Sequence, residues 1–450
     1  MKNAELKQNY LLHAPIAPTL KKATTPMVIG IVTIMAFSLV DTFFISLLGT
    51  NELAAIGFTY PITFILLNFT MGLSIGLNVV LARLLGKGEN HQAKLTASNA
   101  LIMAVLVVLS IAMICLVYID PLFMLLGASD EILIHIKDYM IPWFLGISLL
   151  VVPMVGNGAI RATGDMMTPS IIMVIAGLIN GIMDPLLIFG LGPFPEMGIQ
   201  GAAIATVIAW FCSFIVAMWI LIRKKQLLIL ELIVFKSFIN SCKQVLHIGI
   251  PTATSNMLVP FATGIVTAIV AQFGESYVAG FGVGVRLEAL ALVLAMALSA
   301  SLTTFIGQNY GAKKYDRIKR AVKISVKFLL IFQLALCLIL FMSASGIANL
   351  FSNDPNVQKI ITLYLQILPI SYGIQAATMV IGASINSLHR PIHSLITNTV
   401  RLFVFYVPLS YLGAVWGGFT GLLIGASLSA VFAIGFSLIV LKKSYKELLT

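Results

Sequence analysis

The sequence predicts an all-α membrane protein with twelve spanning helices in two pseudo-symmetric bundles of six. Three observations carry this prediction. Of the 450 residues, 59% are hydrophobic and only 10% are charged, whereas soluble domains carry about a quarter charged residues. The apolar residues form long runs rather than the short alternating segments of a membrane β-barrel. Finally, the second half of the chain repeats landmarks of the first half.

Twelve apolar runs are long enough to cross a bilayer, since a spanning helix needs roughly 20 residues. We place them at residues 25–49, 53–85, 95–119, 132–155, 168–191, 198–222, 245–273, 277–309, 321–349, 357–386, 392–412 and 415–441. Residues 25–222 then form an N-terminal lobe and residues 245–441 a C-terminal lobe. The segments 1–24, 223–244 and 442–450 are an N-terminal segment, a linker and a C-terminus. Several spans exceed 20 residues, so tilted or kinked helices are expected.

Lysine and arginine lie almost entirely on one side of these spans. The termini and the regions of the even-numbered loops hold 24 of the 28, and only Lys137 and Lys359, each near the start of a span, fall on the opposite side. By the positive-inside rule, both termini are cytoplasmic. The net charge of +11 is therefore explained by topology, and we expect no nucleic-acid partner. The protein is expected to be a multi-pass monomer of the inner (cytoplasmic) membrane.

The two halves align at a nearly constant offset. Four pairs lie 225 residues apart: Pro26 with Pro251, Gly49 with Gly274, Gly57 with Gly282, and Gly86 with Gly311. Both halves begin on the same side of the membrane, so the repeat is parallel. Such repeats are typical of transporters that bind substrate between their halves and open to each side in turn.

Two aspartates inside the apolar runs have no counterpart in the repeat. Asp41 aligns with Val266 and Asp184 with Val407. A charged residue at the centre of a bilayer costs ~2.5–3.5 kcal/mol on insertion scales. The scaffold does without an acid in the other half, so Asp41 and Asp184 are candidates for function. The alternative is a structural hydrogen-bond anchor.

Asn180 stands four residues before Asp184, so both lie on one helix face. Oxygen atoms of Asp, Asn and Thr suit a hard cation such as Na⁺. The same carboxyl groups can bind a proton, and two neighbouring acids titrate as a pair. The sequence therefore predicts a cation site here and leaves H⁺ and Na⁺ open.

In the second half, the ionisable residues inside spans are Arg286, Glu288 and Arg401. Arg286 and Glu288 are two residues apart and point to different sides of a helix. We place Arg286 and Glu288 among the candidate residues of the substrate cavity. Glu288 would contact a cationic substrate there, and the alternative is an inter-helix polar contact. The histidines and cysteines show no metal-binding spacing, and no nucleophile–base set is present. We therefore expect no enzyme activity, and no cofactor apart from a coupling ion.

Several motifs stand out along the chain: SLVDTFFISLLGTNELAAIGF around Asp41, RATGD at 161–165, NGIMDPLLIFGLG followed by GIQGAAIAT, VGVRLEAL, and GQNYGAKKYDR. Together they resemble the multidrug and toxic compound extrusion (MATE) family, most of all its DinF-like branch. The resemblance implies two six-helix lobes in a V shape with a central cavity. It also implies an antiporter that exports amphipathic, often cationic compounds in exchange for inward H⁺ or Na⁺.

The resemblance also assigns roles to individual residues. It makes Asp41 the coupling acid, and Asn180, Asp184 and Thr206 the rest of the cation site, where Na⁺ is possible. It makes Asn157 a cavity residue linked to that site, and Pro26 a point at which the first span bends.

Two positions depart from the family pattern. Phe37, a cavity residue, stands where some members have a tyrosine, so one hydroxyl is missing from the network. Val259 stands where another branch has a glutamate, so we expect the ion to bind in the N-terminal lobe.

The main alternative is a lipid-linked oligosaccharide flippase of the same superfamily. A flippase needs cationic groups that hold a pyrophosphate, and Arg286 and Arg401 could provide them. A major facilitator protein is disfavoured because the loop ARLLGKGENHQAK lacks the expected G-x-x-x-D-R-x-G-R-R pattern. A channel would conduct continuously in planar bilayers, whereas an antiporter would not.

Overall fold

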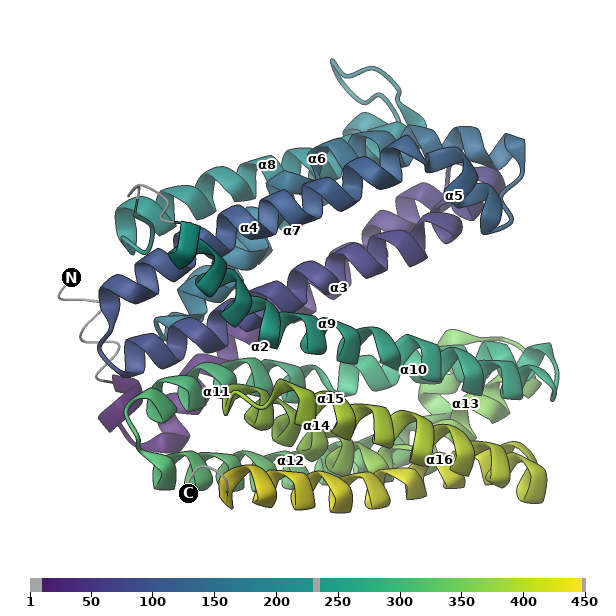
Figure 1. Ribbon diagram of the computed structural model, residues 1–450. Helices are drawn as coiled ribbons and strands as arrows, with labels where there is room; N and C mark the ends of the chain where they lie inside the picture. The colour runs from purple at the N-terminus through teal and green to yellow at the C-terminus, as the bar shows by residue number, and fades with distance from the viewer. Residues whose placement is uncertain (1–9, 230–234, 447–450) are drawn as a thin grey trace. The chain divides into compact units, whose positions relative to one another are not determined.

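A computed structural model describes residues 10–229 and 235–446, and the chain is helical almost throughout these ranges (Figure 1). The first half contains α2 (Ile16–Ser46), α3 (Thr50–Gly86), α4 (Asn90–Val117), α5 (Ile119–Leu125), α6 (Asp130–Ala162), α7 (Met167–Ile188), α8 (Gly198–Trp219) and a π-helical end (Ile220–Lys224). The second half contains α9 (Phe235–Ala271), α10 (Glu275–Ala291), α11 (Val293–Gly311), α12 (Tyr315–Phe351), α13 (Pro355–Ile367), α14 (Pro369–Ser387), α15 (Pro391–Thr399), a π-helix (Val400–Tyr406) and α16 (Val407–Lys446).

Within the described residues, ten helical stretches are individually long and apolar enough to cross a membrane. An eleventh span is the pair α13 and α14, which is bent by 53°. The bend falls at Leu368 and Pro369, because proline removes one backbone hydrogen bond from the helix. The protein is thus a multi-pass membrane protein, as the composition predicts.

The twelfth span lies within the last helical stretch, Pro391–Lys446, which is too long for one crossing. Gly417 and Gly418 interrupt α16 with non-helical backbone, and Gly418 has a φ of 62°. A methyl group on Gly413 would overlap the carbonyl oxygen of Gly421. The chain therefore reverses at the two glycines and packs closely against itself, which gives the twelve predicted helices.

The helices fall into two units, and each unit takes in part of a helix that continues into the other. Unit 1 holds the chain from Thr25 to Ala253, and unit 2 holds Ala14–Thr24 and the chain from Thr254 onward. The boundaries therefore lie inside α2 and α9. The predicted linker 223–244 is helical from Phe235. Its residues 230–234, and the terminal residues 1–9 and 447–450, lie outside the described ranges.

The start of α9 belongs to unit 1 because glycines allow it to approach α3. A Cβ on Gly72 would lie 2.5 Å from the carbonyl oxygen of Gly249, and one on Gly76 would lie 2.6 Å from that of Val245. Small residues four apart are the usual means of close helix contact in membranes. This contact fastens the first turns of α9 within unit 1, before the chain enters unit 2.

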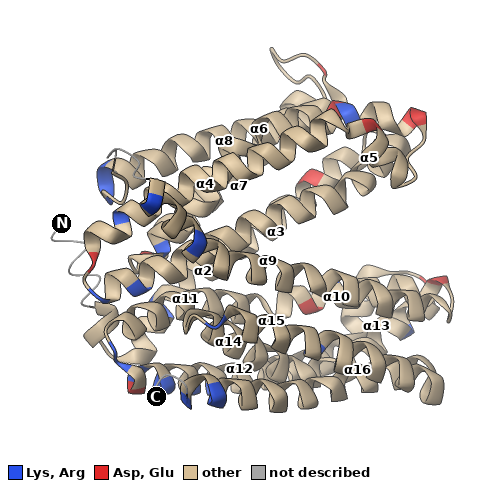
Figure 2. Ribbon diagram, in the orientation of Figure 1, with Lys and Arg blue, Asp and Glu red and all other residues tan. Residues whose placement is uncertain are grey.

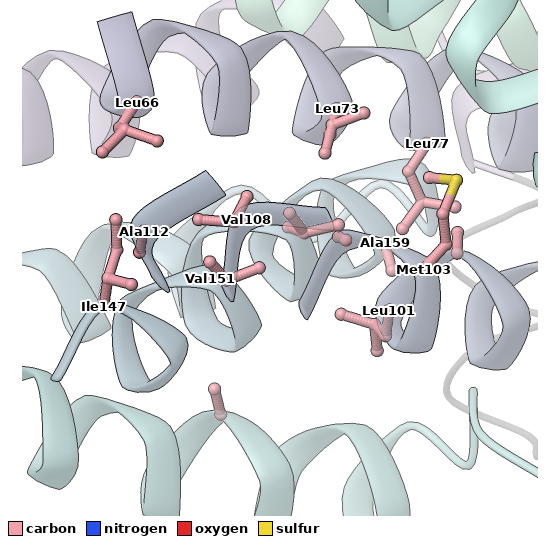
Figure 3. Packing of buried hydrophobic residues seen from close by; sticks show 14 of the residues in the cluster. Leu66, Leu73, Leu77, Leu101, Met103, Val108, Ala112, Ile147, Val151 and Ala159 are labelled. Atoms are coloured by element: carbon pink, nitrogen blue, oxygen red, sulfur yellow. The ribbon is translucent and has the colours of Figure 1, made fainter. Parts of the chain in front are cut away.

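The core of unit 1 is built from α3, α4 and α6, whose apolar side chains interdigitate (Figure 3). The side chains are mostly aliphatic and vary in size, which lets neighbouring helices fit closely. The labelled members are Leu66, Leu73, Leu77, Leu101, Met103, Val108, Ala112, Ile147, Val151 and Ala159. Residues of α2, α7 and α8 join the same core, among them Ile45, Ile172 and Ala202.

Charged residues lie mainly at the ends of the helices. In each unit most Lys and Arg gather at one end (Figure 2). This is the distribution that the count of basic residues in the loops predicts.

The turn between α6 and α7 contains the RATGD motif and braces one end of unit 1. Gly164 has a φ of 87°, which glycine adopts without strain. Arg161 donates a hydrogen bond to Ser74 Oγ on α3 at 3.0 Å. Asp165 accepts one from the backbone N–H of Thr168 at 3.2 Å and so supports the start of α7.

Asp165 also forms a buried ion pair with Lys225, which follows the π-helical end of α8. Their side chains are 5% and 10% exposed, and Lys225 Nζ lies 2.6 Å from Asp165 Oδ2. Burial alone would raise the pKa of Asp165. Lys225 and the hydrogen bonds from Thr168 outweigh burial and hold the pKa well below the usual carboxyl range.

Candidate functional site

Helices α2 and α7 pack side by side in unit 1, in the same direction and in a constant register. Ser170 Oγ lies 3.7 Å from Met27 Sδ. A Cβ on Gly30 would lie 3.3 Å from Ser170 Cα and from the sulfur of Met173. The paired residues Met27 with Ser170 and Gly30 with Met173 both differ by 143. Position 37 is therefore expected to face position 180 and its neighbours.

Phe37 fills a notch made by two glycines on α7. Its ring lies so close to Gly177 and Gly181 that a methyl group on either glycine would overlap it. Phe37 is thus a packing residue within unit 1, and it fixes the distance between α2 and α7. A tyrosine hydroxyl is absent here, as the sequence indicates.

Asp41 lies one turn beyond Phe37 and meets Asp184 at the same register of 143. The two carboxyl groups are close enough to share a hydrogen bond, which requires a proton on one of them. Asp184 is completely buried and Asp41 is half-buried. One oxygen of each carboxyl group, Asp41 Oδ1 and Asp184 Oδ2, is buried without a hydrogen-bond partner. The structure therefore brings together the two acids that have no counterpart in the second half of the repeat.

Asn180 and Thr206 complete this cluster. Asn180 Nδ2 donates to Asp184 Oδ1 at 3.0 Å and to Thr206 Oγ1 at 3.4 Å. Thr206 in turn donates to the carbonyl oxygen of Ala202, one turn back on α8. The amide hydrogen atoms thus lie between oxygen atoms of two side chains, as a bound cation would. All four predicted members of the cation site come together.

Tyr139 is a member of this site that the sequence reasoning missed. It is buried on α6, and its phenol interacts electrostatically with both Asp41 and Asp184. Its hydroxyl group comes from a different helix than the one missing at Phe37. The sequence offers little signal for it, because Tyr139 directly follows the charged residues Lys137 and Asp138 near the start of the span.

Asn157 does not join the cluster. It is buried on α6, 18 residues after Tyr139, which is about 27 Å along a regular helix. Its Oδ1 has no hydrogen-bond partner. Pro26 lies inside α2, which continues through it, and the division between the units falls just before it, after Thr24.

Glu288 lies in unit 2 among polar and aromatic side chains. Tyr364 donates a hydrogen bond to Glu288 Oε2 at 2.7 Å. Gln375, which donates to Ser371 Oγ at 3.2 Å, lies near the same carboxyl group. Arg401 interacts with it electrostatically. Arg286 is exposed on the same helix, and none of the hydrogen bonds or ion pairs found among the described residues involves it. The two charges on α10 thus point apart, as expected from their spacing.

The cluster around Asp41 has the chemistry of a monovalent cation site. The described residues contain no group of three or more His, Cys, Asp or Glu of the kind that holds a transition metal. Two carboxyl groups with an amide and a hydroxyl can instead hold H⁺, or Na⁺ through oxygen ligands. Two anionic carboxylates this close repel each other strongly in a medium of low dielectric constant. A cation bound between them removes that repulsion.

Comparisons with known proteins cover nearly the whole chain. A family model described as MatE matches residues 26–186 and again 251–412, so the same model detects both halves of the repeat. A protein of Shewanella oneidensis named FAD transporter is 42% identical over 414 residues, with 92% of each chain covered. A Bacillus subtilis protein named probable multidrug resistance protein YoeA is 23% identical, with 87% and 85% covered. The crystal structure of the Vibrio cholerae MATE transporter VcmN in the bent form superposes with a TM-score of 0.91 at 30% identity, covering 98% and 99%.

Proposed function

Because the chain belongs to the MATE family of membrane transporters, we propose that it exports its substrate in exchange for H⁺ or Na⁺ bound between Asp41 and Asp184. One observation carries this proposal. Two adjacent carboxyl groups lie within a membrane-spanning bundle, and each keeps a buried oxygen without a partner. We place both termini on the cytoplasmic side, from the distribution of Lys and Arg. The assignment to the DinF-like branch stays a prediction.

Cation binding would act through the packing of α2. With the cation bound, the two carboxyl groups can stay in contact, and α2 and α7 keep their register through Phe37. Without it, mutual repulsion favours separation of Asp41 from Asp184. Since α2 continues from unit 1 into unit 2 next to Pro26, a shift of α2 offers a direct route between the units. The cation therefore selects between two packings of α2, as a switch must.

Two classes of substrate have support. The 42% identity to a protein named FAD transporter favours a flavin dinucleotide, and we take this as the first candidate. Relatives at 23% identity named as multidrug resistance proteins favour the amphipathic cations expected from the sequence. The flippase alternative shares one requirement with FAD, since both substrates carry a pyrophosphate that cationic side chains must neutralise.

The membrane potential distinguishes the two classes. Each negative charge that leaves a cell with a negative interior gains ~2.3 kcal/mol per 100 mV. Exchange of one inward cation for one outward monovalent cation moves no net charge and gains nothing. Export of FAD should therefore accelerate as the interior becomes more negative, and one-for-one export of a cationic dye should not.

The test uses purified protein in liposomes oriented to export. Flavin fluorescence would report FAD, and a cationic dye would report the second class, after separate jumps of pH and of Na⁺. We expect one ion jump to drive transport in the wild type and not in Asp41→Asn. Ion-driven transport that persists in this variant would disprove the site. Transport of the dye but not of FAD would show that the substrates are amphipathic cations, the second class.

A further inference from the structure

In unit 2, we propose that Glu288 and Arg401 recognise the edge of a nitrogen heterocycle in which an N–H donor stands beside a ring acceptor. Both ring systems of FAD present such an edge: the imide of the flavin, and the amino group and N1 of the adenine. This inference rests on the proposed export of FAD and assigns part of the substrate to a place in the fold.

Glu288 and Arg401 are near each other but not paired. They interact electrostatically, yet none of the ion pairs within 4.0 Å found among the described residues joins them. Opposite charges in a medium of low dielectric constant attract strongly. A polar group that contacts both would therefore satisfy a carboxylate and a guanidinium that do not satisfy each other directly.

Both side chains are held by neighbouring residues. Arg401 Nε donates to Asn398 Oδ1 at 3.0 Å, and Asn398 donates to Ser255 Oγ at 2.9 Å on α9. Among the described hydrogen bonds, none uses the two terminal nitrogens of Arg401. Tyr364 holds the Glu288 carboxylate through Oε2. Each group is thus oriented by the protein while part of its hydrogen-bonding capacity remains.

The backbone around Arg401 is irregular. Arg401 lies in a π-helix, Val400–Tyr406, and single π-helical turns occur frequently at functional sites. In a π-helix, residues five apart share a face, so Arg401 and Tyr406 are on one side. Tyr406 also interacts electrostatically with Glu288. The irregular turn therefore directs a charge and an aromatic ring toward the same carboxylate.

Aromatic side chains surround Glu288. Tyr364 and Tyr372 are almost completely buried, whereas Tyr406 is half-buried. Of these three rings, Tyr406 alone can offer a face on which a planar base would stack. The Glu288–Arg401 pair supplies the edge contacts: a carboxylate accepts from an N–H group, and a guanidinium donates to a ring oxygen or nitrogen.

Glu288 and Arg401 are half-buried, and both lie well inside spanning segments. Charged residues at this depth face the bundle interior or water rather than lipid. We therefore expect their exposed parts to face the interior of the bundle, where a polar solute can reach them.

The experiment measures equilibrium binding to the full-length protein in detergent, by quenching of flavin fluorescence and by calorimetry for ADP. The probes are FAD, FMN, riboflavin and ADP. We expect Glu288→Gln and Arg401→Gln to weaken FAD binding by about tenfold or more. Arg401→Lys keeps the positive charge but loses the planar guanidinium with its paired N–H donors, so it should weaken FAD binding by less. Lys359→Gln, an exposed change on α13, is the matched control and should leave binding unchanged.

The probes decide which ring is bound. If the flavin is recognised, Glu288→Gln weakens riboflavin and FMN and leaves ADP unchanged; if the adenine is recognised, the reverse holds. The inference is overturned if the wild type binds and exports FAD while all three variants, folded by thermal unfolding, bind it with unchanged affinity. A wild type that neither binds nor exports FAD overturns both this inference and the FAD proposal. The ion response of Asp41→Asn tests the cation site independently of these binding measurements.

Discussion

The first and fifth helices of each unit occupy related places in the repeat but carry opposite chemistry. In unit 1, α2 and α7 bring Asp41 against Asp184. In unit 2, the related positions are Val266 and Val407, and both pack in the apolar core. The fifth helix also differs in backbone. The segment of α7 that carries Asn180 is a regular α-helix, whereas the related segment of unit 2 is the π-helix that carries Arg401.

The two units also differ in which of these two helices carries the larger side chain at the contact. Unit 1 sets a large Phe37 against Gly177 and Gly181. The related residues of unit 2 are a buried Ala262 on the first helix, and Val400 and Val404 on the fifth helix.

The two differences show that the repeat duplicates a scaffold without duplicating its sites. A fold determines where helices meet, and the side chains at the meeting point determine the chemistry. Unit 1 uses the meeting point of its first and fifth helices for two acids, which suits a cation. Unit 2 fills the same point with valines and carries its charges on Glu288 and Arg401. Each of the following predictions tests one part of this division.

The largest expected effect is a loss of stability, and it follows from a substitution in the turn between the fourth and fifth helices. In unit 1 this turn has Gly164 followed by Asp165, and in unit 2 the related residues are His389, with a φ of 60°, and Arg390. Asp165→Asn leaves Lys225 buried without its partner, which should destabilise unit 1 by about 3–5 kcal/mol. Thermal unfolding in detergent would measure it.

The pH dependence of this ion pair has a definite sign. The pKa of Asp165 is below its ordinary value of 3.8, so the pair stabilises the fold above about that pH. The stabilisation is lost as the pH falls below it. Adding Lys225→Gln to Asp165→Asn should restore part of the stability. An unchanged unfolding temperature for Asp165→Asn alone would show that the pair contributes nothing.

The next effect concerns coupling. Asp41→Asn removes one charge of the carboxyl pair and should reduce the response of transport to the ion gradient on the order of 100-fold, or ~2.7 kcal/mol of coupling free energy. Glu288→Gln in unit 2 should weaken substrate binding and leave the ion response intact. Equal loss of ion response in both variants would contradict the division between the units.

The sequence was sufficient to predict the twelve spans and to single out the four residues that the structure brings together around Asp184. The spans could be predicted because burial in lipid imposes long apolar runs. Asp41, Asn180 and Asp184 could be singled out because polar residues inside such runs are costly and rare. Thr206 required the family resemblance, since a threonine in a span attracts no attention by itself.

Other features required the packing of distant helices. Tyr139 and Tyr364 are ordinary residues in a span, and only the fold shows that each faces an acid on another helix. The unit boundaries inside α2 and α9 depend on contacts such as Gly72 with Gly249. A polar linker at 223–244 was the natural sequence-based choice, although the contacts place the division later.

A smaller effect tests the glycine notch. Gly177→Ala would place a methyl group inside the ring of Phe37, so α2 must move away from α7. Overpacking of this kind costs about 1–3 kcal/mol and should separate Asp41 from Asp184, which weakens ion binding. Unfolding temperature and ion affinity would both be measured. Phe37→Leu combined with Gly177→Ala should recover part of both; the absence of any effect from Gly177→Ala would show that the notch does not set the spacing.

The smallest effect compares the two tyrosines that face the acids. Tyr139→Phe removes a hydroxyl near Asp41 and Asp184, and Tyr364→Phe removes the hydrogen bond to Glu288. Each should cost about 1 kcal/mol, but in different measurements. Tyr139→Phe should weaken ion binding about fivefold with unchanged FAD affinity, and Tyr364→Phe should do the reverse. Since the two substitutions are chemically identical, any crossing of these effects would mean that the units share one site, and the division drawn between them would fail.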